Sequence, residues 1–287
     1  MMNLLKLFWL TICGAHAERL DGSGLFCGEY SNAGQFLSLA KLFGDHPFIR
    51  MPYRKEGYQA FKQSALTATQ CGVQIIALLD QFDNNDTMIR CLDTIKNEMP
   101  FIKHIELFNE LPACKYPGQQ IKSLQELIMR TNTYSDWIHA NMPGVQVLTM
   151  APYNSIDERA FDEWGVTNTR ILKDLVLYTT ADIAAVHIYG DSISERLQML
   201  RLADNLKSWN KETPYKKAVW ITEIGVDGWK NHVAYYHSMV RLAVNVMHPD
   251  KLIWYRASID HLTSPDAVFA LENRNNGEHS PLWDELA

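Results

Sequence analysis

The sequence predicts a single (β/α)8 barrel (an α/β fold), and three observations carry that prediction. Short runs rich in β-branched and aromatic residues alternate with longer segments of helical periodicity, a rhythm typical of parallel strands joined by helical crossovers. Eight such runs fit into the 287 residues, and one barrel of this kind takes about 250 residues. The glycine-rich G-x-G-x-x-G turn that would favour an open doubly wound sheet is absent from the sequence.

The predicted elements alternate along the whole chain. The eight predicted strands are residues 25–29, 47–50, 73–79, 104–108, 145–150, 183–188, 217–222 and 252–255. The predicted helices between and after them are residues 33–43, 57–70, 86–98, 119–140, 170–178, 192–209 and 231–247. Gly72 and Gly144 stand between a helix and the next strand, where the chain must reverse. Ser192 followed by Glu195 forms the pattern of a capping box at the start of its helix.

Composition and charge indicate one globular domain. Hydrophobic residues make up 47% and charged residues 21% of the chain, without a repeat, low-complexity tract or linker. The net charge is −6 and like charges do not cluster. Since nucleic-acid binding normally requires a basic patch or stripe, we expect no nucleic-acid partner. We expect the protein to be a monomer.

The N-terminus resembles a secretory signal peptide. Lys6 precedes the apolar residues 7–13, and Ala15-His16-Ala17 has the small-x-small form of a cleavage site. We therefore expect residues 1–17 to be a signal peptide, residues 18–287 to form the barrel, and the protein to be secreted or periplasmic. The apolar run is too short to span a bilayer, so we expect no stable membrane insertion after cleavage. The alternative is an apolar N-terminal tail.

Cysteines leave two alternatives open. The chain beyond residue 17 contains Cys27, Cys71, Cys91 and Cys114. An even number in an oxidising compartment permits disulfides with three possible pairings, and four free thiols are the other interpretation. The spacing does not match a zinc site.

Two glutamates carry the functional prediction. Asn109-Glu110 follows the fourth predicted strand, and Glu223 follows the seventh, with Gly225 two residues later. Carboxylates at the C-terminal ends of barrel strands face the mouth of the barrel, where (β/α)8 enzymes hold their active sites. Two carboxylates in one cleft are what glycoside hydrolysis requires. The alternative for Glu110 is a solvated loop position, whereas a buried strand end rarely holds an idle ionised group such as Glu223.

These motifs resemble those of a known group of enzymes. Asn-Glu after the fourth strand and Thr-Glu-x-Gly after the seventh are similar to the signature of the retaining glycoside hydrolases of clan A, which includes families 5 and 39. The resemblance implies that Glu110 is the acid/base and Glu223 the nucleophile. It further implies that Asn109 bonds the sugar 2-hydroxyl. The C-terminal residues 267–283 resemble the segment that closes the barrel in this clan.

The sixth strand ends in a second element of the resemblance. His187-Ile188-Tyr189 is similar to the His-x-Tyr element of the clan, which implies that Tyr189 orients Glu223. His187 would contact the sugar or Glu110. Alternate residues of an extended strand point to the same side, which favours a shared site, whereas His187 alone would suggest a core histidine.

Arg50 and Trp254 are further candidates for substrate contact. Arg50 ends the second predicted strand, similar to the clan residue that keeps the nucleophile ionised, with a structural ion pair as the alternative. Trp254 on the eighth strand resembles an aromatic platform under the sugar, with barrel core as the alternative. Other polar or aromatic residues near strand ends receive no role: Glu29, Asp80, Tyr153 and Asn154.

The sequence thus predicts a retaining β-glycosidase, endo-acting on a β-linked polysaccharide, with no cofactor and no metal. The motifs G-x-S-x-G, H-E-x-x-H and the P-loop are absent from the sequence, which leaves serine hydrolase, zincin and nucleotide triphosphatase functions without support. Two alternatives stay open: a carbohydrate-binding barrel without activity, and a (β/α)8 enzyme of another reaction class.

Overall fold

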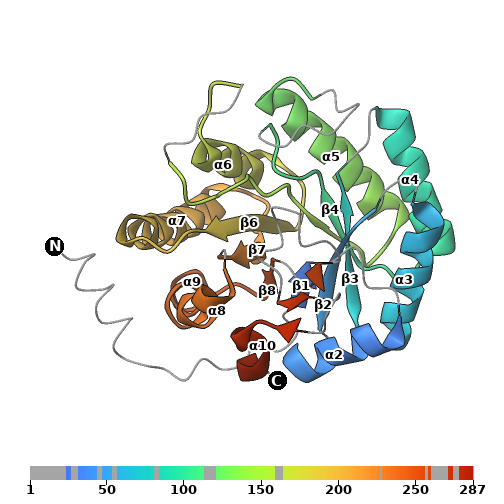
Figure 1. Ribbon diagram of the computed structural model, residues 1–287. Helices are drawn as coiled ribbons and strands as arrows, with labels where there is room; N and C mark the ends of the chain where they lie inside the picture. The colour runs from blue at the N-terminus through green and yellow to red at the C-terminus, as the bar shows by residue number, and fades with distance from the viewer. Residues whose placement is uncertain are drawn as a thin grey trace.

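A closed barrel of parallel strands is the centre of the computed structural model (Figure 1). The structure describes residues 24–26, 32–43, 47–53, 57–80, 84–112, 121–158, 164–226, 228–255, 258–259, 271–273 and 278–286. Within these ranges the barrel order is β1 to β8, and each strand pairs in parallel with the next. The barrel strands are β1 (Gly24–Phe26), β2 (Phe48–Pro52), β3 (Gln74–Leu79), β4 (His104–Leu107), β5 (Gln146–Leu148), β6 (Ile183–Tyr189), β7 (Ala218–Gly225) and β8 (Lys251–Trp254). The predicted (β/α)8 fold is confirmed.

Helices surround the barrel, as Figure 1 shows. They are α2 (Ala33–Phe43), α3 (Tyr58–Gln70), α4 (Asn85–Glu98), α5 (Leu124–Asn141), α6 (Asn168–Tyr178), α7 (Ile193–Glu212), α8 (Trp229–Tyr235), α9 (Arg241–Met247) and α10 (Pro281–Leu286). The π-helical turn η1 (Tyr236–Val240) joins α8 to α9, so the single helix predicted for this region contains a π turn. Short strands β9 (Ser258–Ile259), β10 (Glu272–Asn273) and β11 (Glu278–His279) form a small separate sheet.

Turn glycines and helix caps that the sequence predicts occur at several ends of helices and strands. Gly72 and Gly144 both adopt a positive φ at the helix-to-strand turns where chain reversal was expected. The Ser192 side chain accepts a hydrogen bond from the Glu195 backbone N–H, and the Glu195 side chain bonds back to Ser192, which confirms the capping box of α7. Helix α5 begins at Leu124, after the N-cap Ser123, because Ser123 caps the Glu126 N–H. The predicted start at Gln119 lies outside the described residues.

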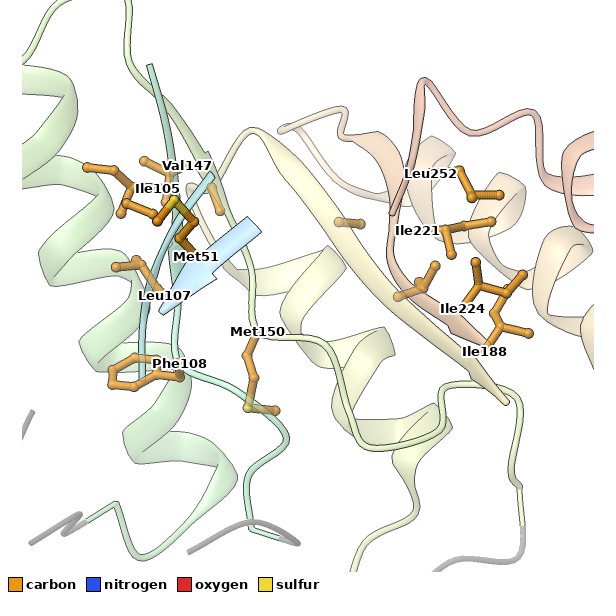
Figure 2. Packing of buried hydrophobic residues seen from close by; sticks show 14 of the residues in the cluster. Met51, Ile105, Leu107, Phe108, Val147, Met150, Ile188, Ile221, Ile224 and Leu252 are labelled. Carbon is orange, nitrogen blue, oxygen red and sulfur yellow. The ribbon is translucent and has the colours of Figure 1, made fainter. Parts of the chain in front are cut away.

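Two apolar clusters pack against the barrel strands, one inside the barrel and one between the barrel and the helices. One is drawn from barrel strands and the residue Ala151 just after β5, and no helix contributes to it, so it fills the barrel interior; its members are Phe48, Ile76, Leu148, Ala151, Ile183, Ala185, Trp220 and Ile253. The larger cluster combines strand and helix residues and fills the layer between barrel and helices. Figure 2 shows part of this layer, with Ile105 and Leu107 of β4 near Val147, and Ile188 near Ile224. Because side chains alternate along a strand, Arg50 faces the same interior as Phe48.

Several sequence predictions concern residues that lie outside the described ranges. The expected signal peptide, residues 1–17, and the cysteines Cys27 and Cys114 lie outside them. Cys71 and Cys91 are free thiols, so neither forms a disulfide. Burial raises the pKa of Cys91 to about 12, so the thiol stays protonated and inert. None of the described helices is both long and apolar enough to cross a membrane.

The capping box of α7 makes a stability prediction. We expect Ser192→Ala to lower the free energy of unfolding by about 1 kcal/mol, because the Glu195 N–H loses its acceptor. Urea denaturation followed by circular dichroism measures the change. Ser208→Ala, at an exposed position inside the same helix, is the matched control and should leave stability unchanged or slightly raised, since alanine is the better helix former. Equal losses in both variants would contradict a capping role.

Candidate active site

Arg50 lies at the centre of a buried polar network in the barrel. Its guanidinium is fully buried and binds Glu106 of β4 through two bonds, Nε to Oε2 at 2.6 Å and Nη2 to Oε1 at 2.9 Å. The third bond runs from Nη1 to Glu223 Oε1 at 2.5 Å, and the fourth from Nη2 to Asn109 Oδ1 at 2.9 Å. Burial would lower the pKa of Arg50, but the two carboxylates raise it above its ordinary value, so the guanidinium is charged.

The Arg50 network unites residues from three strands. The sequence offered two interpretations of Arg50, an ion pair or a contact to the candidate nucleophile, and the structure shows both in one side chain. Asn109, predicted to bond substrate, lies in the same network. Glu106 was missed by sequence reasoning. The available signal was a charged residue inside the apolar run Ile105-Glu106-Leu107, because a buried strand holds a carboxylate only with a partner.

A β-bulge aims Glu223 into the barrel. Trp220 belongs to the interior cluster, and three residues later Glu223 also faces the interior, which strict alternation forbids. The pairing of β7 with its neighbours shifts register in this segment, between Val186 and His187 on one side and after Ile221 on the other. The extra residue turns Glu223 inward. Strand β7 runs on to Gly225, so Glu223 lies within the strand and not, as predicted, directly after Thr222 at its end.

The sixth strand brings His187 and Tyr189 to the two glutamates. The Tyr189 hydroxyl donates a hydrogen bond to Glu223 Oε2, as the sequence resemblance implied. His187 Nδ1 lies 2.9 Å from Glu110 Oε1 and 3.6 Å from Glu223 Oε2. One imidazole nitrogen thus faces both carboxylates, which places Glu110 and Glu223 in one site.

The backbone around Glu110 is held in an unusual conformation. Phe108 and Glu110 have φ values of 67° and 50°, in the left-handed region that non-glycine residues rarely adopt. The Glu110 N–H donates to the Ala151 carbonyl at 3.1 Å, which ties this turn to the chain after β5. Phe108 packs against Tyr134 of α5 with ring centroids 6.0 Å apart. Strained positions of this kind persist where packing holds them, and they concentrate at functional sites.

Burial dominates the electrostatics of the site. It lowers the pKa of His187 to about 4, so the imidazole is neutral at physiological pH and its contact with Glu110 is a hydrogen bond. Burial raises the pKa of Glu223 above its ordinary value, while Arg50 and the hydrogen bond from Tyr189 act in the opposite direction. Burial also raises the pKa of Tyr189 well above its usual range, which keeps its hydroxyl a donor.

The same residues have the chemistry of a possible cation site. Glu110, His187 and Glu223 each offer one ligand atom, and these atoms lie within 4.8 Å of one another. Two carboxylates and an imidazole could hold a metal ion. The buried guanidinium of Arg50 already neutralises Glu223 from the other side, at 2.5 Å. This positive charge opposes a cation at the same carboxylate.

Trp254 requires a correction. Its side chain is 2% exposed and packs against the rings of His232 and Tyr235 from the helix layer, at 5.3 Å and 6.1 Å between centroids. It pairs in register with Ile224, which faces the helices, so Trp254 faces away from the site. The prediction of a sugar platform at Trp254 is wrong, and its core alternative holds. The next residue, Tyr255, reaches the site instead and meets the Tyr189 ring at 6.2 Å.

The remaining candidates around the mouth have mixed outcomes. Asp80 directly follows β3 and is buried. The Asn154 side chain bonds the backbone of Tyr189, and Tyr153 stacks on the Tyr189 ring. Glu29 lies outside the described residues.

Comparison with known proteins identifies the fold. No protein-family model and no curated protein matches the sequence. Cellulose synthase subunit Z from Clostridioides difficile is similar in structure, with 11% identity, a TM-score of 0.62, and coverage of 93% of this chain and 99% of that one. The GH39 enzyme from Xanthomonas axonopodis pv. citri has 13% identity, a TM-score of 0.60, and coverage of 95% and 66%. Endoglucanase Cel5A from Pseudomonas stutzeri has 13% identity, a TM-score of 0.57, and coverage of 90% and 84%. The fold is thus a (β/α)8 barrel, as in these similar structures.

Arg50 generates a stability prediction. We expect Arg50→Met to lower the free energy of unfolding by about 3–5 kcal/mol, because Glu106 and Glu223 become buried carboxylates without their cation. Urea denaturation measures the change. Arg170→Met is the matched control: Arg170 also binds a carboxylate, Asp174, but its side chain is 58% exposed, so a loss below about 1 kcal/mol is expected. Similar losses for both variants would contradict the central role of Arg50.

Tyr189 generates a prediction about the charge of Glu223. The Tyr189 hydroxyl stabilises the ionised carboxylate, so Tyr189→Phe should raise the pKa of Glu223 further. Titration of ¹³C-labelled glutamate carboxyls by NMR measures this, with Glu223→Gln assigning the signal. Tyr58→Phe is the matched control, because Tyr58 bonds the exposed Glu98 and should raise the pKa of Glu98 alone. An unchanged Glu223 titration in Tyr189→Phe would refute the proposed hydrogen bond.

Proposed function

We propose that this protein is a retaining β-glycosidase. The observation that carries the proposal is the approach of Glu110 and Glu223, whose nearest ligand oxygens lie within 4.8 Å across the His187 imidazole. Retaining glycosidases hold their two carboxyl groups about 5–5.5 Å apart, whereas inverting enzymes need about 6.5–9.5 Å to admit a water molecule. The close approach of one oxygen from each carboxylate supports the shorter spacing, and with it direct attack by one carboxylate rather than by an activated water.

Glu223 is the nucleophile and Glu110 the acid in this mechanism. A Glu223 oxygen attacks the anomeric carbon and forms a glycosyl ester. At the same time the bond between that carbon and the leaving oxygen breaks, and the leaving oxygen takes the proton of Glu110. Water then attacks the same carbon, gives its proton to Glu110 and releases Glu223 as a carboxylate. Arg50 and Tyr189 both bond Glu223, and these bonds favour its ionised form before attack.

The substrate in this proposal is a β-linked oligo- or polysaccharide, cleaved within the chain. Similar structures include an endo-β-1,4-glucanase from Xanthomonas axonopodis pv. citri and a psychrophilic family 10 endo-β-1,4-xylanase. Two aromatic rings at the mouth, Tyr189 and Tyr255, suit the flat C–H faces of sugars. The proposal includes secretion or periplasmic export through residues 1–17, and a monomeric state.

Replacement of each glutamate tests the proposal. Dinitrophenyl β-glycosides of glucose, xylose, mannose and galactose serve as substrates, because their leaving group needs little acid assistance. We expect Glu223→Ala to lower kcat by about a thousandfold or more, since no covalent intermediate can form. Added azide should then give an α-glycosyl azide. Glu110→Ala should form the glycosyl-enzyme yet hydrolyse it slowly, and azide should give the β-glycosyl azide.

Two comparisons make this experiment decisive. Glu98→Ala, at an exposed glutamate paired with Lys62 at the end of α4, is the matched control and should keep the wild-type rate. NMR of the wild-type product should show the β-anomer first. A first-formed α-anomer, or a Glu223→Ala variant with a near wild-type rate, would overturn the assignment. Wild-type inactivity on every glycoside of the panel, together with inactivity on β-glucans, xylans, mannans and galactans, would favour a carbohydrate-binding barrel.

A further inference from the structure

An exposed aromatic ring borders the site and takes no part in the mechanism above. Tyr153 follows β5 and its side chain is 54% exposed. Its ring stacks on that of Tyr189, with centroids 6.2 Å apart and an interplanar angle of 28°. Tyr189 in turn bonds Glu223, so Tyr153 lies one ring away from the candidate nucleophile.

The chain around Tyr153 is fixed to the strand that holds the site. The Asn154 side-chain amide donates to the Tyr189 carbonyl at 3.2 Å. Ser155 pairs with His187 in both directions: its N–H donates to the His187 carbonyl at 2.9 Å, and its Oγ accepts from the His187 N–H at 3.1 Å. The Tyr153 backbone is thus ordered before any ligand arrives, which lowers the entropy cost of binding to its ring.

The order of strands decides on which side of the cleft Tyr153 lies. Around the barrel, Glu110 follows β4, Tyr153 follows β5, and Tyr189 ends β6. The Glu110 N–H bonds the Ala151 carbonyl, two residues before Tyr153, at 3.1 Å. Tyr255 approaches Tyr189 from β8, beyond the strand of the nucleophile. A general acid protonates the leaving oxygen, so the leaving sugar lies on the side of Glu110, which is the side of Tyr153.

We infer that Tyr153 forms the binding site for the leaving sugar. The apolar face of a β-linked pyranose stacks on the open side of the Tyr153 ring while Glu110 protonates the oxygen between the two sugars. The same ring receives an incoming sugar when a sugar rather than water attacks the glycosyl-enzyme. The inference rests on the proposed function. It adds a residue, Tyr153, that contacts the leaving group only when the leaving group is a sugar.

Two substrates with the same glycone test the inference. One is the β-disaccharide fluoride of the sugar that the aryl glycoside panel identifies, and the other is the matching β-linked trisaccharide. Both place a disaccharide on the Glu223 side, but only the trisaccharide places a sugar ring beside Tyr153. We expect Tyr153→Ala to lower kcat/KM for the trisaccharide by about fivefold to tenfold and to leave the fluoride within about twofold of wild type.

Matched variants separate ring stacking from general damage. Tyr153→Phe keeps the ring and should retain most of the trisaccharide activity. Tyr215→Ala removes an equally exposed tyrosine just before β7, at the opposite end of the barrel, and should change neither substrate. Equal losses on both substrates in Tyr153→Ala, or no loss on the trisaccharide, would overturn the leaving-sugar site while the proposed function stands. A wild-type protein that does not cleave the fluoride would overturn the proposed function, and the leaving-sugar site with it.

Discussion

The buried guanidinium of Arg50 is the interaction on which the site depends. It neutralises two carboxylates, Glu106 and Glu223, in a barrel interior that also contains the smaller apolar cluster. Neither carboxylate would tolerate this position alone, because an unpaired charge in a protein interior costs several kcal/mol. The two-bond pairing with Glu106 fixes the plane of the guanidinium, and the remaining Nη1 donor then points at Glu223. Glu106 thus positions Arg50, and Arg50 positions Glu223.

Irregular backbone at two places orients the two glutamates, which regular strands could not do. A strand alternates strictly, so Trp220 and Glu223 could not both face the interior without the bulge of β7. The left-handed turn at Phe108 and Glu110 lets the chain leave β4 and still keep Glu110 beside His187. Such strain is tolerated because the surrounding packing holds these positions. The rest of the barrel follows ordinary propensity and supplies that rigidity.

The sequence allowed prediction of the fold and of most residues at the site, for identifiable reasons. The two strands with glutamates, the His187 and Tyr189 pair and the capping box of α7 depend on short-range patterns, and the structure contains all of them. Trp254 was misplaced because the apolar run of β8 does not mark which of its residues face inward: Ile253 belongs to the interior cluster, so its neighbour Trp254 faces the helices. Glu106 was overlooked because its partner Arg50 is distant in the chain, so only the fold reveals that its charge is compensated.

The charges around the two candidate catalytic glutamates divide their roles. Glu110 and Glu223 each present an oxygen within 4.8 Å of the other, so the charge of Glu110 raises the pKa of Glu223. The Arg50 guanidinium and the Tyr189 hydroxyl both bond Glu223, and both favour its ionised form against the burial that raises its pKa. His187 lies between the two carboxylates as a neutral ring and adds no charge to either side. The placement of one arginine and one tyrosine at Glu223 therefore supports its proposed role as the nucleophile, with Glu110 beside His187 as the proposed acid.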